Sequence, residues 1–144
     1  MEIFDLLAPL KALGLRFAMA RMPAEDRDHM VDLHDTMMAC YHKDAREGCF
    51  RSDYQFHNTL ITMAQHEVLR TTHISLSNRS QRGRYLAPRF DQTKLDVAMT
   101  AHTKVIEAIK ANDTDKAAEI LHDHVSRTKE FVLATLRQSD LVLE

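Results

Sequence analysis

The chain has 144 residues, the length of a single domain whose core needs no disulfide bonds. It contains 3 Gly and 3 Pro, where average usage would give about 17 of the two together. Together with an aromatic content of 6%, this disfavours sheet-rich folds. The formal charge of -2 at pH 7 disfavours DNA binding by this segment itself.

Two further features concern the cellular compartment. No apolar run approaches the roughly 18 residues that a membrane helix needs, and the opening Met-Glu-Ile-Phe-Asp lacks the basic region of a signal peptide. We therefore expect a cytoplasmic protein with no membrane partner. In that compartment Cys40 and Cys49 are expected to be reduced thiols.

The first half of the chain predicts three helices. Apolar residues step by three and four from Ile3, which predicts a first helix to about Arg21. Pro23, followed by two acidic residues, indicates the start of a second helix whose apolar stripe runs to position 40 or 41. We interpret Gly48 as a break and Ser52 as the N-cap of a third helix.

The second half predicts three more helices, over about 68–86, 91–111 and 114–137. Pro88 ends the fourth because the residue before a proline is pushed out of helical geometry. Asp113 or Thr114 can cap the sixth, and the short polar break before it makes the fifth and sixth helices antiparallel neighbours. The prediction is an all-α fold: a compact antiparallel bundle of about six helices forming one domain over residues 1–144.

Polar groups occupy several buried stripes of these helices. Asp53 and His57 lie four residues apart on the third helix, which places both side chains on one face. His102 and His124 occupy positions at which the periodicity of the fifth and sixth helices predicts an apolar residue. Because a buried unpaired carboxylate is costly, Asp53 should shift its pKa, find cationic partners or bind a metal ion. Three imidazoles and one carboxylate suit zinc, nickel, copper or iron.

Spacing alone leaves other interpretations open. An Asp-His pair four residues apart is common as a surface ion pair, and a single histidine on a buried stripe is usually hydrogen-bonded in the core. His34 and His73 also fit buried stripes, on the second and fourth helices. His122 points about 200° away from His124 around the helix.

The ordered set of motifs resembles a known family. It comprises Asp53-x-x-Phe56-His57-x-x-Leu60, then Ala101-His102 followed by Ile106 and Ala108-Ile109, then Asp115, Ala118 and His124-Val125. With intervals of 4, 45 and 22 residues between the four candidate donors, this pattern resembles the FCD domain. That domain is the effector-binding C-terminal domain of GntR-type transcription regulators of the FadR branch. The resemblance spans about Glu2 to Leu136.

The resemblance implies a function and a site. It implies that Asp53, His57, His102 and His124 bind a divalent metal ion, zinc or nickel being preferred, inside the bundle. It also implies a small organic acid as effector, a homodimer, and DNA binding only through a separate winged-helix domain. That domain is not found in this chain. From the sequence we add His73, Asn78 and Arg79 on the fourth helix as candidate contacts to the acid, since an arginine there offers a bidentate grip on a carboxylate.

The chain departs from the family pattern in its first helix. Leu7 and Lys11 stand where many relatives carry Arg and Glu, which weakens the expectation that this helix contributes to ligand binding. We predict no catalytic residues and no enzymatic activity. The alternatives are a metal-dependent hydrolase or non-haem oxygenase, for which no second-shell base is evident, and a structural helical adaptor.

Overall fold

The computed structural model describes residues 2–80 and 90–143, with side chains through residue 138. Within these ranges the chain forms six helices and no strand, which confirms the predicted all-α fold. The helices are α1 (Glu2–Arg21), α2 (Ala24–His42), α3 (Arg46–Met63), α4 (Glu67–Arg79), α6 (Gln92–Lys110) and α7 (Thr114–Leu143). None of them is both long enough and apolar enough to span a bilayer.

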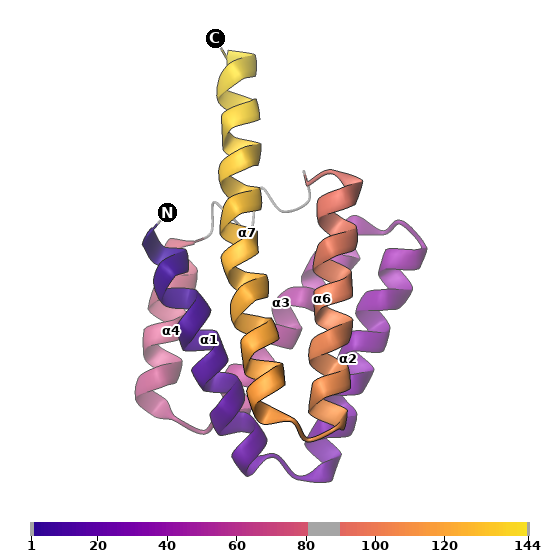
Figure 1. The fold of residues 1–144 in the computed structure, drawn as a ribbon, viewed down its shortest axis with the longest axis vertical. Helices are drawn as coiled ribbons and strands as arrows, with labels where there is room; N and C mark the ends of the chain where they lie inside the picture. The colour runs from indigo at the N-terminus through magenta and orange to yellow at the C-terminus, as the bar shows by residue number, and fades with distance from the viewer. Residues whose placement is uncertain (1, 81–89, 144) are drawn as a thin grey trace.

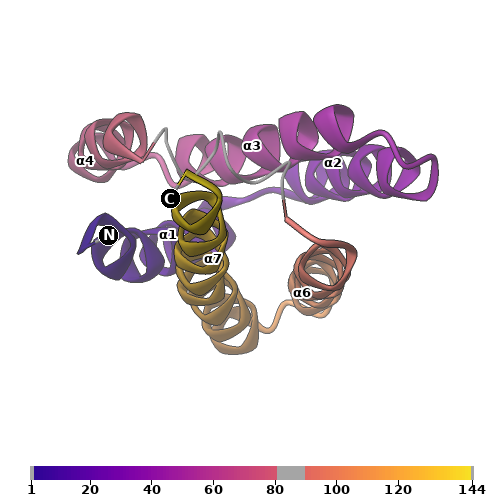
Figure 2. The same ribbon diagram turned by 90° about the horizontal axis from the view of Figure 1, so that it is seen from above.

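The helices form two layers. Seen from above, α4, α3 and α2 lie on one side, and α1, α7 and α6 lie on the other (Figure 2). The packing partners agree with this view, because α1 packs on α7, α3 and α4, while α6 packs on α7 and α2. The long α7 crosses the middle of its layer, and its C-terminal turns extend beyond the other helices (Figure 1).

The largest of three apolar clusters among the described residues joins the two layers. It includes fully buried side chains from α3, α6 and α7, among them Phe56, Leu60, Ile109 and Leu121. Burying one side chain of this size contributes about 1.5–3 kcal/mol, so this core supplies most of the driving force for folding. The polar residues discussed below are therefore held on helices that apolar packing has already positioned.

Several helix ends follow the predicted signals. Pro23 precedes α2, and the Asp91 side chain accepts a hydrogen bond from Lys94 N at the start of α6. Asp113 Oδ1 accepts from Lys116 N at 3.2 Å, which caps α7 as predicted. The short turn between α6 and α7 makes these two helices packed neighbours.

The predicted start of the third helix is wrong. Helix α3 begins at Arg46, and Gly48 and the buried Ser52 both lie inside it. A Cβ atom on Gly48 would lie 2.9 Å from Cys40 Sγ, so this glycine permits close packing of α2 on α3 instead of breaking a helix. The turn before α3 has no side-chain cap, which explains why the sequence did not reveal it.

Two other boundaries differ from the prediction. Helix α4 ends at Arg79, with Ser80 as its C-cap, and the rest of the predicted fourth helix lies outside the described residues. Helix α7 continues to Leu143, beyond the predicted end near residue 137. Neither difference moves a candidate site residue to another helix.

Candidate metal centre

Helix α3 supplies two of the four predicted donors. Asp53 and His57 emerge from the same face, and His57 Nε2 lies 3.1 Å from Asp53 Oδ1. Phe56, which is 0% exposed, fixes the rotation of α3 by packing into the core between them. The Asp53 side chain remains 28% exposed, whereas that of His57 is 7% exposed. The pair therefore lies at the boundary between the core and an open space.

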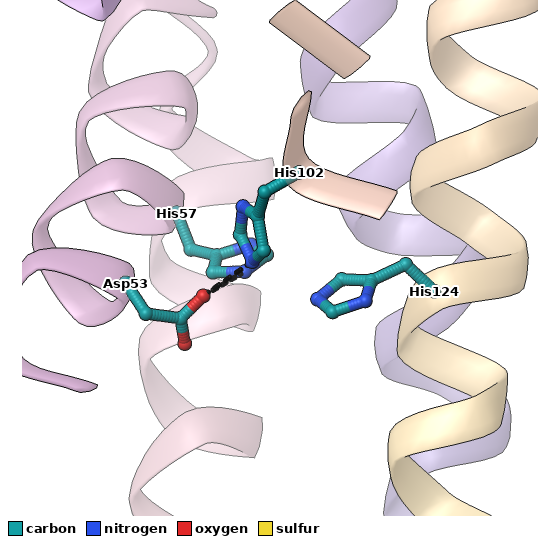
Figure 3. A group of neighbouring side chains, drawn as sticks. All are labelled: Asp53, His57, His102 and His124. Carbon is teal, nitrogen blue, oxygen red and sulfur yellow. Dashed lines mark hydrogen bonds and ion pairs between the residues drawn. The ribbon is translucent and has the colours of Figure 1, made fainter. Parts of the chain in front are cut away.

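Helices α6 and α7 supply the other two donors. His102 reaches from α6 and is 1% exposed, and its Nε2 lies 2.6 Å from Asp53 Oδ1. The ring of His124, from α7, stacks nearly parallel to that of His57, with centroids 5.9 Å apart. Its centroid is 4.5 Å from that of His102. Figure 3 shows the four side chains, two from α3 and one each from α6 and α7, pointing toward a common space.

One donor atom from each of Asp53, His57, His102 and His124 lies within 4.8 Å of the other three. The structure thus brings together the four residues that the sequence singled out, across 71 positions of the chain. Such convergence is not required by the core, because three helices could bury three apolar residues here instead. It is the arrangement expected of ligands to a common ion.

Hydrogen bonding leaves part of this cluster unsatisfied. Among the described residues, His57 Nδ1 and both ring nitrogens of His102 are buried without a hydrogen-bond partner. His102 Nε2 does have an ionic partner, because it lies 2.6 Å from Asp53 Oδ1. Buried polar atoms are nearly always paired, so this cluster needs a further partner. A metal ion is a partner that accepts electron pairs from a carboxylate and from imidazoles alike.

The protonation states also suit a metal ion. Burial opposes ionisation of Asp53, but its interactions with His57 and His102 outweigh burial and hold its pKa well below the ordinary value. Burial, reinforced by the positive charge of Lys11, lowers the pKa of His57 to about 4. Burial and the two neighbouring histidines lower the pKa of His124 well below its ordinary value. At neutral pH Asp53 is therefore a carboxylate, and His57 and His124 are neutral imidazoles, which are the forms that bind metal.

The cluster opens onto a cavity of about 520 Å³. Asp53, His57 and His124 line it, whereas His102 does not, so His102 closes the inner side of the cluster. Much of the remaining wall is apolar and comes from α1, α3 and α6, including Phe4 and Phe50. A small organic molecule can therefore reach the cluster from this one space.

Helix α4 contributes one of the three predicted acid contacts to this cavity. His73 is 2% exposed and lines the cavity, together with Ser77, whose Oγ lies 3.3 Å from His73 Nε2. Asn78 and Arg79 are exposed and are not among the lining residues. The cavity-facing row of α4 is His73, Ser77 and Ser80, and Arg79 lies about 100° around the helix from Ser80.

Helix α1 contributes more to the cavity wall than the sequence analysis expected. Phe4, Leu7 and Lys11 line the cavity at intervals of three and four residues, which is one face of α1. The departure from the family pattern at positions 7 and 11 therefore does not remove α1 from the cavity. The apolar residues that step by three and four from Ile3 indicated a different face of this helix, and that prediction is wrong: Leu6 and Leu13 on that face are 58% and 43% exposed, whereas Leu7 is buried.

Other polar residues singled out in the sequence lie elsewhere. The side chain of His122 is 45% exposed and lies 3.4 Å from Asp123 Oδ1, away from the cluster. His34 is buried at the contact of α2 with α6, where its Nε2 lies 3.1 Å from Thr103 Oγ1. Cys40 and Cys49 are free thiols, as predicted.

Comparisons with known proteins give one family and one fold. The family model described as FCD domain matches residues 2–127. The solved structure of E. coli McbR/YncC has a similar fold, with a TM-score of 0.82 over 92% of this chain and 67% of that chain. At 16% sequence identity this likeness shows the fold alone. No curated protein matches the sequence.

Proposed function

The chain belongs to the FCD domain family, and on this premise we propose that it is the effector-binding domain of a GntR-type transcription regulator in the cytoplasm. In this proposal Asp53, His57, His102 and His124 bind a divalent metal ion, Zn²⁺ or Ni²⁺. The effector is a small organic acid that binds in the cavity beside the ion. The domain acts as a homodimer and reaches DNA only through a winged-helix domain.

The single observation that carries this proposal is the convergence of four donors with unsatisfied buried nitrogens at the wall of a cavity. A purely structural cluster would pair its buried nitrogens with protein groups, and the described residues offer no hydrogen-bond partner to the Nδ1 atom of His57 or of His102. A divalent ion bound by one carboxylate and neutral imidazoles keeps a net charge of +1. When bound, the ion supplies a Lewis-acidic positive charge that holds a carboxylate ligand.

Sensing requires that the acid favours one arrangement of the helices. The cavity is lined by residues of five helices, including α1, α4 and α7, so an acid bound there contacts elements of both layers. Coupling of about 1–3 kcal/mol between effector and DNA binding is enough for a regulatory switch. We place the role of this chain in binding and not in catalysis.

The test is elemental analysis of the purified protein, combined with mass spectrometry of small molecules released on denaturation. We expect about one divalent ion per chain and thermal stabilisation by added metal and carboxylates. His124→Ala should lose the ion, and His122→Ala, on the same helix but outside the cluster, should keep it. Metal-free protein that added Zn²⁺ or Ni²⁺ does not stabilise would overturn the proposal.

A further inference from the structure

The cavity carries a cation that the metal centre does not use. Lys11, on α1, is half-buried and lines the cavity together with Asp53, His57 and His124. Its positive charge acts on the cluster, because it is one of the causes that lower the pKa of both His57 and His124. Lys11 therefore shares this cavity with three of the four donors, on the part of the wall that α1 contributes.

The charges around the cavity are strongly unbalanced. Among the described lining residues, Asp53 is the only acid, whereas Lys11 and Arg51 are cations. A bound divalent ion would raise the positive charge further. A monocarboxylate on the ion would neutralise its net charge of +1, and the Lys11 ammonium adds a second positive charge across the same space. Opposite charges that face one partly enclosed cavity attract each other more strongly than they do in bulk water.

The rest of the wall limits the shape of an occupant. Besides the donors and Lys11, the lining includes Leu7 and Val125, which are both buried. An apolar spacer suits this part of the wall better than a hydroxylated chain, because hydroxyl groups would lose hydrogen bonds to water there. The cavity, at about 520 Å³, has room for a chain of several carbons.

We propose that the effector is a dianionic acid, with one carboxylate at the metal centre and the second anionic group on Lys11, joined by an apolar spacer. This inference rests on the proposed function and deepens it. It assigns Lys11 as the residue that selects acids with two anionic ends over acids with one.

The experiment compares matched acids on the metal-loaded protein. Calorimetric titration with succinate, glutarate and adipate is set against butyrate, valerate and hexanoate, which have the same chain lengths. Wild-type protein should bind at least one diacid about 10-fold more tightly than its matched monoacid, and Lys11→Met should abolish this preference. Lys11→Arg, which keeps the charge, should retain it. Metal content, measured in the same samples, should not change.

A control isolates the position of the charge. Lys104→Met removes a lysine that is exposed on α6 and outside this cavity, with the same change in net charge. It should leave the preference intact. Equal binding of matched diacids and monoacids, or a preference that survives in Lys11→Met, would overturn the inference while leaving the proposed function standing. Failure of every acid to bind, or of the metal to bind, would overturn the proposed function instead.

Discussion

Two regions of the bundle bury histidine side chains, and they use the ring nitrogens differently. Where α2 meets α6, His34 Nε2 lies 3.1 Å from the Thr103 hydroxyl. That hydroxyl donates to the Met99 carbonyl, so it accepts from His34. At the proposed metal centre, the Nδ1 atoms of His57 and His102 are buried without a hydrogen-bond partner among the described residues.

The acids beside these histidines differ as well. Asp35 lies 3.7 Å from His34 Nδ1 with a side chain that is 71% exposed. Asp53 is 28% exposed and lies within 3.1 Å of two histidines. Burial of histidine therefore does not by itself indicate a ligand. The informative features are convergence on one point and nitrogens left without protein partners.

The largest expected effect is on metal-dependent stability. If Zn²⁺ binds only the folded protein, a concentration 1,000 times the Kd should raise the free energy of unfolding by about 4 kcal/mol. Chelation should remove this gain, and Asp53→Asn should abolish most of it, because the amide keeps the shape but loses the charge. Denaturant unfolding with and without Zn²⁺ measures the gain. Asp35→Asn, beside His34, should keep the full Zn²⁺-dependent gain in stability. If both variants lost this gain, the two histidine regions would not differ in metal binding.

The next effect is on metal affinity itself. His102→Ala should weaken Zn²⁺ binding by about 100-fold or more, since even a group that only orients a ligand is worth about 10- to 100-fold. His34→Ala removes another buried imidazole, one that has a protein partner, and it should leave Zn²⁺ affinity unchanged. Competition titration against a chelator measures both. Similar losses in the two variants would mean that His102 has a structural role.

The sequence predicted most of the difference between these two histidine regions, but not all of it. The steps of three and four in the apolar residues placed His102 and His124 on buried faces of the right helices. Periodicity placed His34 and His73 on buried faces equally well, so it could not separate ligands from core histidines. The spacing of the whole motif set made that distinction, through its resemblance to a family.

What the sequence missed has local physical reasons. The start of α3 has no capping side chain, and Gly48 looked like a break because its packing against Cys40 is a tertiary contact. Arg79 was expected to contact the acid, but it is exposed at the end of α4, and the cavity-facing row passes through Ser77 and Ser80. Lys11 was noted only as a departure from the family pattern.

A smaller effect is expected at the wall of the cavity. His73 lines the cavity outside the metal cluster, so His73→Leu should leave metal content unchanged and weaken binding of the organic acid by about 10-fold, the loss of roughly one good hydrogen bond. Calorimetry on the metal-loaded protein measures this. Asn78→Leu, on the exposed side of the same helix, should have no effect. A loss in Asn78→Leu that equals the loss in His73→Leu would place the acid elsewhere on α4.

The smallest effect should occur at His34, whose ring nitrogen Nε2 already has a protein partner. Thr103→Val keeps the size of the side chain but removes the oxygen that accepts from His34 Nε2, so stability should fall by about 1 kcal/mol. The gain on adding Zn²⁺ should stay at its wild-type value, because the nitrogens that bind the ion lie in the other region. Parallel denaturation curves with and without Zn²⁺ separate the two quantities. A reduced Zn²⁺ gain in Thr103→Val would show that the two histidine regions are coupled through α6, which carries both Thr103 and His102.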